Sequence, residues 1–380
     1  CEAGACLPGE TICDGMVVIL MYMDADNDLE SYLVGDWHEM ELANVEDVSW
    51  LRVFVLMDKR GQGDAALYEV LNGRSQQIAG PELGLAATGY GEVNMGAGGT
   101  VSAFIHDVKN YVGGDAGYYL MLSDHGDGWS RKSKNQPEDA PALKAVCVDE
   151  TSNGDELHTS ELQQAISGEG LLVISFDACL MGMAEVAYEL RNDALVMVGS
   201  QETEPGEGWA FTELLSQFGA SEIPSPEEFG RLVVYTYMDS YASSYDDITQ
   251  AAYDLTAMDA LATAVDAAAV ELESLPSSAY SSICSSMEWY ACFWGSCYPN
   301  TDLTHLLTRA MAVDSRDNDM IYQTALNRLE EAVLYERHAR GHSNARGMNV
   351  YFPCSQSFST SYSNLQWSVD THWDEMLQAH

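Results

Sequence analysis

Two residues of this chain, Cys179 and His125, carry a thiol and an imidazole, the groups used in cysteine-based nucleophilic catalysis. Cys179 follows an apolar stretch at 171–175 that predicts a buried strand, and a segment with helical spacing follows at 180–190. His125 follows a second apolar stretch at 118–123. Because the carboxyl ends of parallel strands meet at one edge of a sheet, we predict that Cys179 is a nucleophile and His125 is its general base.

A buried cysteine taken alone is more often a small apolar core residue than a reactive one. Core packing does not readily explain a histidine and a cysteine that both follow strands and that both precede glycine or other small residues. We therefore favour the catalytic interpretation over the packing one.

The residues around these two side chains resemble the clostripain family of cysteine peptidases. The motifs that carry the resemblance are Ser-Asp-His-Gly at 123–126 and Asp-Ala-Cys-Leu-Met-Gly at 177–182. The histidine lies about 50 residues upstream of the cysteine, as in caspases. Four further stretches resemble family motifs, so the resemblance covers residues 16–380: 21–30, 91–96, 199–209 and 347–353.

The resemblance implies a caspase-like fold, a three-layer αβα sandwich with a mostly parallel central sheet and a helical C-terminal extension. Alternating strand and helix patterns through 16–200 independently predict a mostly parallel sheet with helices on both faces. We expect a cysteine-containing lead-in at 1–15, a catalytic core at 16–221, and a mainly helical extension at 222–380 packed on the same sheet.

Several individual elements are also expected. Strands are predicted at 16–23 and 51–57, and a β-ribbon strand at 66–71. A helix is predicted from Asp28, as its N-cap, to about residue 44, and another over 303–338.

Peptide hydrolysis needs a nucleophile, a proton carrier and hydrogen-bond donors for the developing oxyanion. We expect a protonated His125 and a helix N-terminus to lower the pKa of Cys179. As in caspases, the backbone N–H groups of Cys179 and Gly126 are expected to be the oxyanion donors. The sequence offers no obvious third residue, so we predict a Cys-His dyad.

Acidic residues near the nucleophile suggest a pocket for a basic side chain. The resemblance implies an acid in the glycine-rich loop after the next strand, a position that Glu207 matches, and Asp177 is the other candidate. Either carboxylate would pair with a substrate Arg or Lys. Glu202 and Glu204 could contribute, although a solvated acidic loop explains those two slightly better.

The segment 129–145 holds four of the chain's 17 basic residues, together with two prolines and no hydrophobic period. The sequence predicts an exposed loop. Clostripain relatives cleave themselves internally, so the resemblance implies processing in this loop. The candidate positions are Arg131, Lys132, Lys134 and Lys144. An ordinary solvated loop is the alternative.

The formal net charge of −42 excludes nucleic acid and anionic membranes as favoured partners, because both would be repelled. It favours cationic protein or peptide substrates, although acidity for solubility alone is an equal alternative. The longest apolar run, at 16–23, is strand-sized, so no membrane span is expected. No cofactor is needed for the predicted chemistry. Calcium is an expectation from the family, but the acids at 24–28 do not fit an EF-hand.

Nine cysteines leave eight beside Cys179, enough for four disulfides and typical of a protein outside the cytosol. The chain opens on Cys1, which fits a processed form. We expect a secreted monomer, in one piece or nicked into two chains. Lipid anchoring through Cys1 to a cell surface is the second interpretation.

Three functions remain in view. The favoured one is a secreted cysteine endopeptidase that cleaves after Arg or Lys and processes itself. A catalytically silent binding or adhesion protein on a caspase-like scaffold is the second, and intact His125 and Cys179 count against it. The third is a peptidase specific for acidic residues, which would need basic pocket residues; Arg191 is the basic residue near Cys179.

Overall fold

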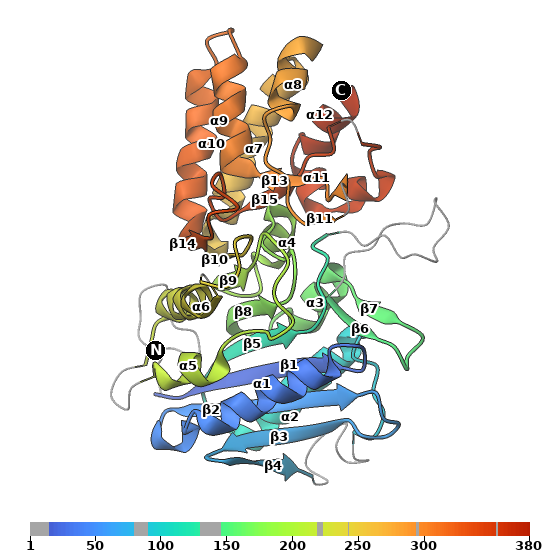
Figure 1. Ribbon diagram of the computed structural model, residues 1–380, viewed down its shortest axis with the longest axis vertical. Helices are drawn as coiled ribbons and strands as arrows, with labels where there is room; N and C mark the ends of the chain where they lie inside the picture. Colours follow the sequence, from blue (N-terminus) through green and yellow to red (C-terminus); the bar gives the residue numbers. More distant parts are fainter. Residues whose placement is uncertain are drawn as a thin grey trace.

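The computed structural model describes residues 15–79, 90–129, 146–218, 223–241, 243–293, 296–354 and 356–380. Across these residues the main sheet has nine strands in the order β14-β10-β9-β8-β5-β1-β2-β3-β4 (Figure 1). Its five central strands run parallel: β9 (Val196–Gly199), β8 (Leu171–Asp177), β5 (Gly117–Ser123), β1 (Val17–Ala25) and β2 (Leu51–Lys59). Antiparallel pairs extend both edges: β3 (Ala66–Leu71) with β4 (Arg74–Ile78), and β10 (Thr249–Asp254) with β14 (Val333–His338).

The central strands are apolar on both faces, as a sheet covered on both sides requires. In β1, Val18, Leu20 and Tyr22 join one hydrophobic core, whereas the alternate residues Ile19 and Met21 join another. Because successive side chains of a strand point to opposite faces, one continuous apolar run supplies both cores.

Helices cover both faces of the sheet. On one side lie α1 (Glu30–Leu42), α5 (Phe211–Ser216) and α6 (Pro226–Tyr241). On the other lie α2 (Gly98–Val112), α3 (Thr159–Ile166) and α4 (Ala184–Leu190). The predicted three-layer α/β/α class is confirmed.

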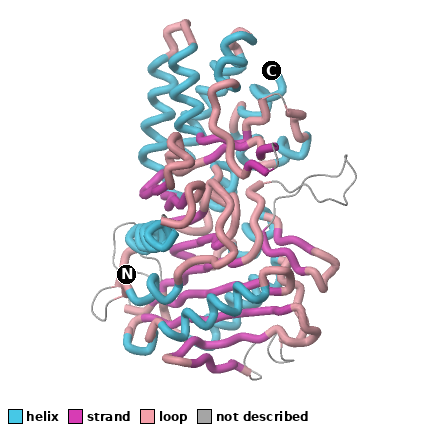
Figure 2. The backbone as a smooth tube through the Cα atoms, in the orientation of Figure 1, coloured by secondary structure: helices cyan, strands magenta, loops and turns pink. Residues whose placement is uncertain are grey.

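The C-terminal part adds β10 and β14 to the sheet and then a group of helices at one end of the molecule (Figure 2). There α10 (Asp319–Ala332) packs against α7 (Met258–Glu273) and α9 (Leu303–Val313). The helical structure predicted over 303–338 is confirmed for α9 and α10 but wrong for residues 333–338, which form β14. Half-buried side chains throughout β14 suit an edge strand paired with β10.

The shorter elements complete the fold. The remaining α-helices are α8 (Ser277–Cys284), α11 (Gln366–Asp370) and α12 (Trp373–Ala379), and the 3₁₀ turns are η1 (Val45–Asp47), η3 (Leu255–Ala257) and η4 (Thr360–Asn364). Three small two-stranded sheets pair β6 (Val146–Asp149) with β7 (Asp155–Leu157), β11 (Cys292–Phe293) with β12 (Ser296–Cys297), and β13 (Asn300–Asp302) with β15 (Asn349–Tyr351).

Two disulfides staple the C-terminal part, Cys284–Cys354 and Cys292–Cys297. Cys147 is a buried free thiol, so the eight cysteines beside Cys179 do not form the four disulfides that their number allows. The first three cysteines lie outside the described residues. Within the described ranges, no helix combines the length and apolarity that crossing a bilayer requires.

Candidate active site

The carboxyl ends of β1, β5, β8 and β9 bring four loops to one edge of the sheet. The strand order changes direction next to β1, and open α/β sheets bind ligands at such a switch point. The loops after β5 and β8 touch at Gly126. A Cβ added to this glycine would lie 2.5 Å from the carbonyl oxygen of Cys179 and 2.9 Å from the Cβ of Ala178. Glycine therefore permits the approach that brings His125 beside the nucleophile loop.

His125 has a partner that the sequence did not reveal. Its Nε2 lies 2.7 Å from Oδ1 of Asp28, which stands two residues before the start of α1. Hydrogen bonding to His125 holds the pKa of the Asp28 carboxyl below its usual value. The predicted N-cap role of Asp28 is wrong: Leu29 is the N-cap residue, and no side chain caps α1. Instead of capping α1, the Asp28 carboxylate contacts the imidazole ring of His125.

Cys179 lies in a tight turn immediately after β8. The next residue, Leu180, has φ of +64°, a left-handed conformation that a leucine adopts only under constraint. The constraint comes from the loop after β9, because the Leu180 N–H donates to the Glu202 carbonyl (3.1 Å) and the Glu204 N–H donates to Cys179 Sγ (3.3 Å). The helix α4 begins only at Ala184, later than predicted.

The charge environment of Cys179 differs from the expectation. Burial raises the pKa of its thiol to about 12, and the carboxylates of Glu204, Glu202 and Asp127 act in the same direction. The hydrogen bond from the Glu204 N–H opposes these effects without overcoming them. The predicted lowering by a helix N-terminus is absent because α4 starts five residues after the sulfur. The unliganded thiol is therefore protonated at neutral pH.

This protonation gives a direct prediction for the unliganded protein. We expect the rate at which iodoacetamide alkylates Cys179 to rise about tenfold per pH unit between about pH 6 and about pH 9, because only the thiolate reacts. Peptide mass spectrometry would follow the modification, with the buried Cys147 as an unreactive internal control. A rate that levels off below about pH 8 would contradict the protonated state.

A cavity of about 180 Å³ joins the two catalytic candidates. His125 and Cys179 both line it, together with four acids that come from different elements: Asp36 of α1, Asp124 after β5, Asp177 of β8 and Glu204 after β9. Leu29 and Leu33 supply apolar wall on the same face of α1 as Asp36. Nucleophile, base and carboxylates thus share one concave site.

Three of these acids, Asp36, Asp177 and Glu204, crowd one another. Asp177 accepts from Ser123 Oγ (2.5 Å), and Glu204 accepts from the side chains of Trp209 (2.9 Å) and Gln250 (3.0 Å). Burial raises the pKa of Asp177 to about 6 and, with repulsion from Asp177, raises the pKa of Glu204 well above its usual value. For Asp36, burial and the nearby Asp177, Glu39 and Glu207 carboxylates raise the pKa to about 9. One buried oxygen of Asp36, Oδ2, has no hydrogen-bond partner. A cation entering this cavity would relieve the crowding.

The structure therefore places two of the four predicted specificity acids in the cavity and two outside it. Asp177 and Glu204 line the cavity, and Glu204 is not part of a solvated loop. Glu207 is exposed and does not line the cavity, although its charge bears on Asp36. Glu202 is buried and faces away from the cavity toward the C-terminal part. The predicted processing residues Arg131, Lys132, Lys134 and Lys144 lie outside the described residues.

Glu202 instead connects the nucleophile loop to the C-terminal part. Its carboxylate accepts from the Ala291 N–H (2.8 Å) and lies 3.1 Å from Nε2 of His342. Nδ1 of His342 contacts Glu288 at 3.1 Å. Burial lowers the pKa of His342, but the two carboxylates outweigh it, so the pKa is raised overall. This buried pairing fixes the loop that holds Cys179, and sequence spacing gave no signal for it.

Comparison with known proteins assigns the family. A family model described as the clostripain family matches residues 21–379. The chain belongs to the clostripain family of cysteine peptidases. Clostripain from Hathewaya histolytica is 24% identical over 426 aligned residues, which cover 95% of this chain and 80% of that protein.

Solved structures of clostripain-family proteins share the fold. An inactive zymogen of a C11 protease from Parabacteroides distasonis superposes with a TM-score of 0.70 at 18% identity, covering 93% of this chain and 97% of that one. A secreted C11 cysteine protease from Bacteroides thetaiotaomicron, bound to an irreversible peptide inhibitor, gives 0.69 at 20% identity, covering 95% and 99%. These similarities support the predicted caspase-like architecture.

Proposed function

We propose that this clostripain-family chain is an endopeptidase that cleaves peptide bonds after Arg or Lys through the pair Cys179 and His125. The observation that carries the proposal is the shared cavity, where a thiol and an imidazole lie with four carboxyl groups. A carboxylate-lined pocket beside a nucleophile selects a cationic side chain next to the scissile bond.

The reaction needs only groups of this chain and water. Cys179 Sγ attacks the carbonyl carbon, and its proton passes to His125 and then to the leaving amine as the C–N bond breaks. Water then hydrolyses the thioester, which releases the carboxylate product and restores the thiol. We assign the oxyanion contacts to the N–H groups of Cys179 and Gly126, which the close approach of the two loops supports. This scheme assigns no chemical step to calcium or to another metal ion.

Substrate binding would also activate the nucleophile. The guanidinium or ammonium group would pair with Asp177 and Glu204 at the base of the cavity, with Asp36 beside them. Glu207 would act at the mouth of the site rather than at its base. Because carboxylate charge raises the pKa of Cys179, a bound cation would lower it and favour the thiolate.

Asp28 is proposed to position His125. Replacing it by asparagine should lower kcat about tenfold while KM for an Arg peptide changes little, because the orienting charge is lost but the pocket remains. Glu30→Gln, in the first turn of α1, is the matched control. Steady-state kinetics of both variants would check this. Equal loss of kcat in the two variants would remove Asp28 from the mechanism.

We further propose self-processing between 129 and 145. The residues that flank this segment support it, because Val146 forms a β-bridge with Gly126 and the Cys147 N–H donates to the carbonyl of His125 (3.3 Å). The chain thus re-enters the described structure beside the catalytic base. Lys144 stands two residues before Val146 in the sequence, which makes it our first candidate.

The two disulfides support a location outside the reducing cytosol, and we propose a secreted monomer, intact or nicked. Anchoring to a cell surface is the second form of this proposal.

Matched fluorogenic peptides ending in Arg, Lys, Asp or Leu test the proposal, with a denaturing gel of each preparation. We expect turnover of the Arg and Lys peptides only and a chain cut at one of the four basic positions. Turnover after Asp would contradict the acidic pocket. No turnover of any peptide, with or without calcium, would favour a silent binding scaffold.

A further inference from the structure

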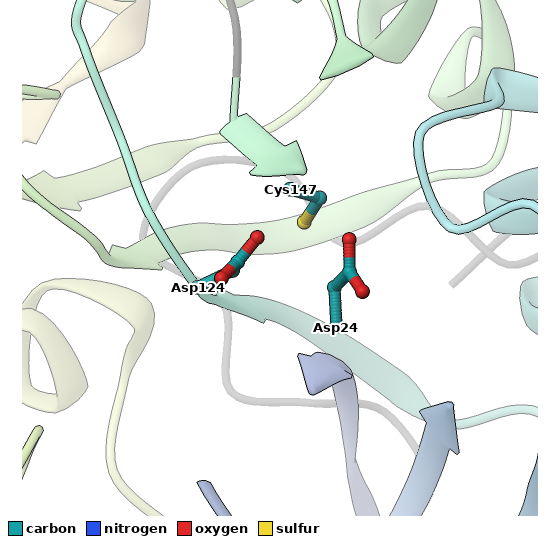
Figure 3. Close-up of side chains that lie close together, drawn as sticks. All are labelled: Asp24, Asp124 and Cys147. Carbon is teal, nitrogen blue, oxygen red and sulfur yellow. The ribbon is translucent and has the colours of Figure 1, made fainter. Parts of the chain in front are cut away.

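A second cluster of reactive side chains lies behind the catalytic histidine. Asp24 near the end of β1, Asp124 just after β5 and Cys147 of β6 each offer one atom, and these atoms lie within 4.8 Å of one another. Figure 3 shows the three side chains pointing toward a common centre. All three residues are buried, with 0%, 4% and 0% of their surface exposed.

The hydrogen bonding of Asp24 is incomplete. Its Oδ1 accepts from the N–H of Asp26 (3.2 Å), but its buried Oδ2 has no hydrogen-bond partner. The Oδ1 atom of the fully buried Asp26 also has none. A buried carboxylate oxygen without a donor is costly, and Figure 3 shows the Asp24 carboxylate on the side of β1 that faces Asp124 and Cys147. This oxygen therefore lacks an electropositive partner.

The surroundings are acidic. Asp58 and Asp149 are also fully buried near the cluster. Buried charges of one sign are normally neutralised by pairing or by a metal ion.

We propose that Asp24, Asp124 and Cys147 bind a divalent transition-metal ion of the zinc type. Two carboxylate oxygens and a thiolate make a mixed ligand set that suits zinc, with water as a fourth ligand. Calcium prefers six to eight oxygen ligands, so a site that includes the Cys147 sulfur disfavours it. When the metal–sulfur bond forms, the thiol releases its proton to solvent.

The ion would tie three separate segments together. Asp124 already accepts from the N–H of Val148 (2.6 Å) and from the side chain of Asn27 (2.7 Å), which fixes its orientation. Metal binding would add a bond from β1 and β6 to the residue next to His125. The role is structural, and it does not depend on the proposed specificity.

The metal content of the purified protein tests the site. The parent protein carries Cys179→Ala, which removes the active-site thiol and any self-cleavage. Zinc or cobalt would be added in excess and incubated long enough for a buried site to exchange. Unbound metal would then be removed by dialysis, and the metal that stays bound would be counted by plasma mass spectrometry. We expect one ion per chain, a thiolate-to-cobalt charge-transfer band, and a higher unfolding temperature with zinc.

Two further substitutions, each made in the Cys179→Ala parent, assign the ligands. Cys147→Ser and Asp24→Asn should each weaken zinc binding at least about tenfold, and Cys147→Ser should abolish the charge-transfer band. Asp115→Asn, in an exposed loop, is the control and should bind as the parent does. Cys1, Cys6 and Cys13 are the same in all variants, so differences report the proposed site. If Cys147→Ser does not fold, Asp24→Asn and the parent spectrum still decide.

Three results would overturn the proposal. The first is no ion retained by the parent, and the second is equal zinc binding by parent and both variants. The third is calcium or magnesium binding that is preferred over zinc and unchanged in Cys147→Ser, which would mean that the thiolate is not a ligand.

Discussion

Replacing Cys179 by alanine should lower peptide turnover by at least about 10⁴-fold and leave the chain in one piece. The thiol supplies the atom that forms the acyl intermediate, and no other described side chain in the cavity can replace it. His125→Asn should cause a loss of similar size, because the proton of the thiol then has no acceptor. The double variant should be no worse than either single one, since the two residues act as a unit.

His106→Asn provides the matched control for the histidine change. His106 lies on α2 and pairs at the surface with Glu169 (2.8 Å), away from the cavity, so its replacement should leave kcat/KM unchanged. Kinetics with an Arg peptide and a denaturing gel of each variant make the comparison. Cut chains in the Cys179→Ala preparation would assign the cleavage to another protease.

Replacing Asp177 by asparagine should reduce kcat/KM for Arg and Lys peptides by roughly 10²- to 10³-fold, because a buried charge-assisted contact is lost. Asparagine preserves the shape of Asp177 and can keep the contact with Ser123 Oγ. Slow turnover of an uncharged Leu peptide should therefore persist or increase. The ratio of Arg to Leu turnover, measured in one assay, is the decisive quantity.

Glu207→Gln distinguishes the two acids that the sequence favoured equally. Glu207 is exposed and outside the cavity, so this variant should lose at most about tenfold in kcat/KM. A loss for Glu207→Gln equal to that for Asp177→Asn would mean that the cationic side chain binds at the mouth of the site. Normal Arg turnover by Asp177→Asn would contradict the proposed pocket.

The sequence alone determined the mostly parallel sheet and the strands that lead into the two catalytic candidates. The stretches at 16–23, 51–57 and 118–123 are mainly apolar, with Arg52 as their one charged residue, a pattern typical of strands buried on both faces, and β1, β2 and β5 form there. The motifs at 123–126 and 177–182 then located His125 and Cys179 at one edge, because they follow two of these strands. Local pattern was sufficient for this part.

Tertiary structure decided the rest. Asp28 contacts His125, and Asp36 lies close enough to Asp177 for the two charges to interact. The members of each pair are far apart in the sequence, so no local pattern predicts these contacts. Burial of the thiol raises the pKa of Cys179, and the carboxylate of Glu204, one of the pocket acids, adds to this effect. The segment 333–338 was predicted as helix, but it forms the strand β14 because it pairs with β10, which lies at least 80 residues earlier in the chain. A local sequence pattern cannot reveal such a distant partner. Sequence thus fixes which residues carry the chemistry, whereas long-range packing fixes their partners, charge and burial.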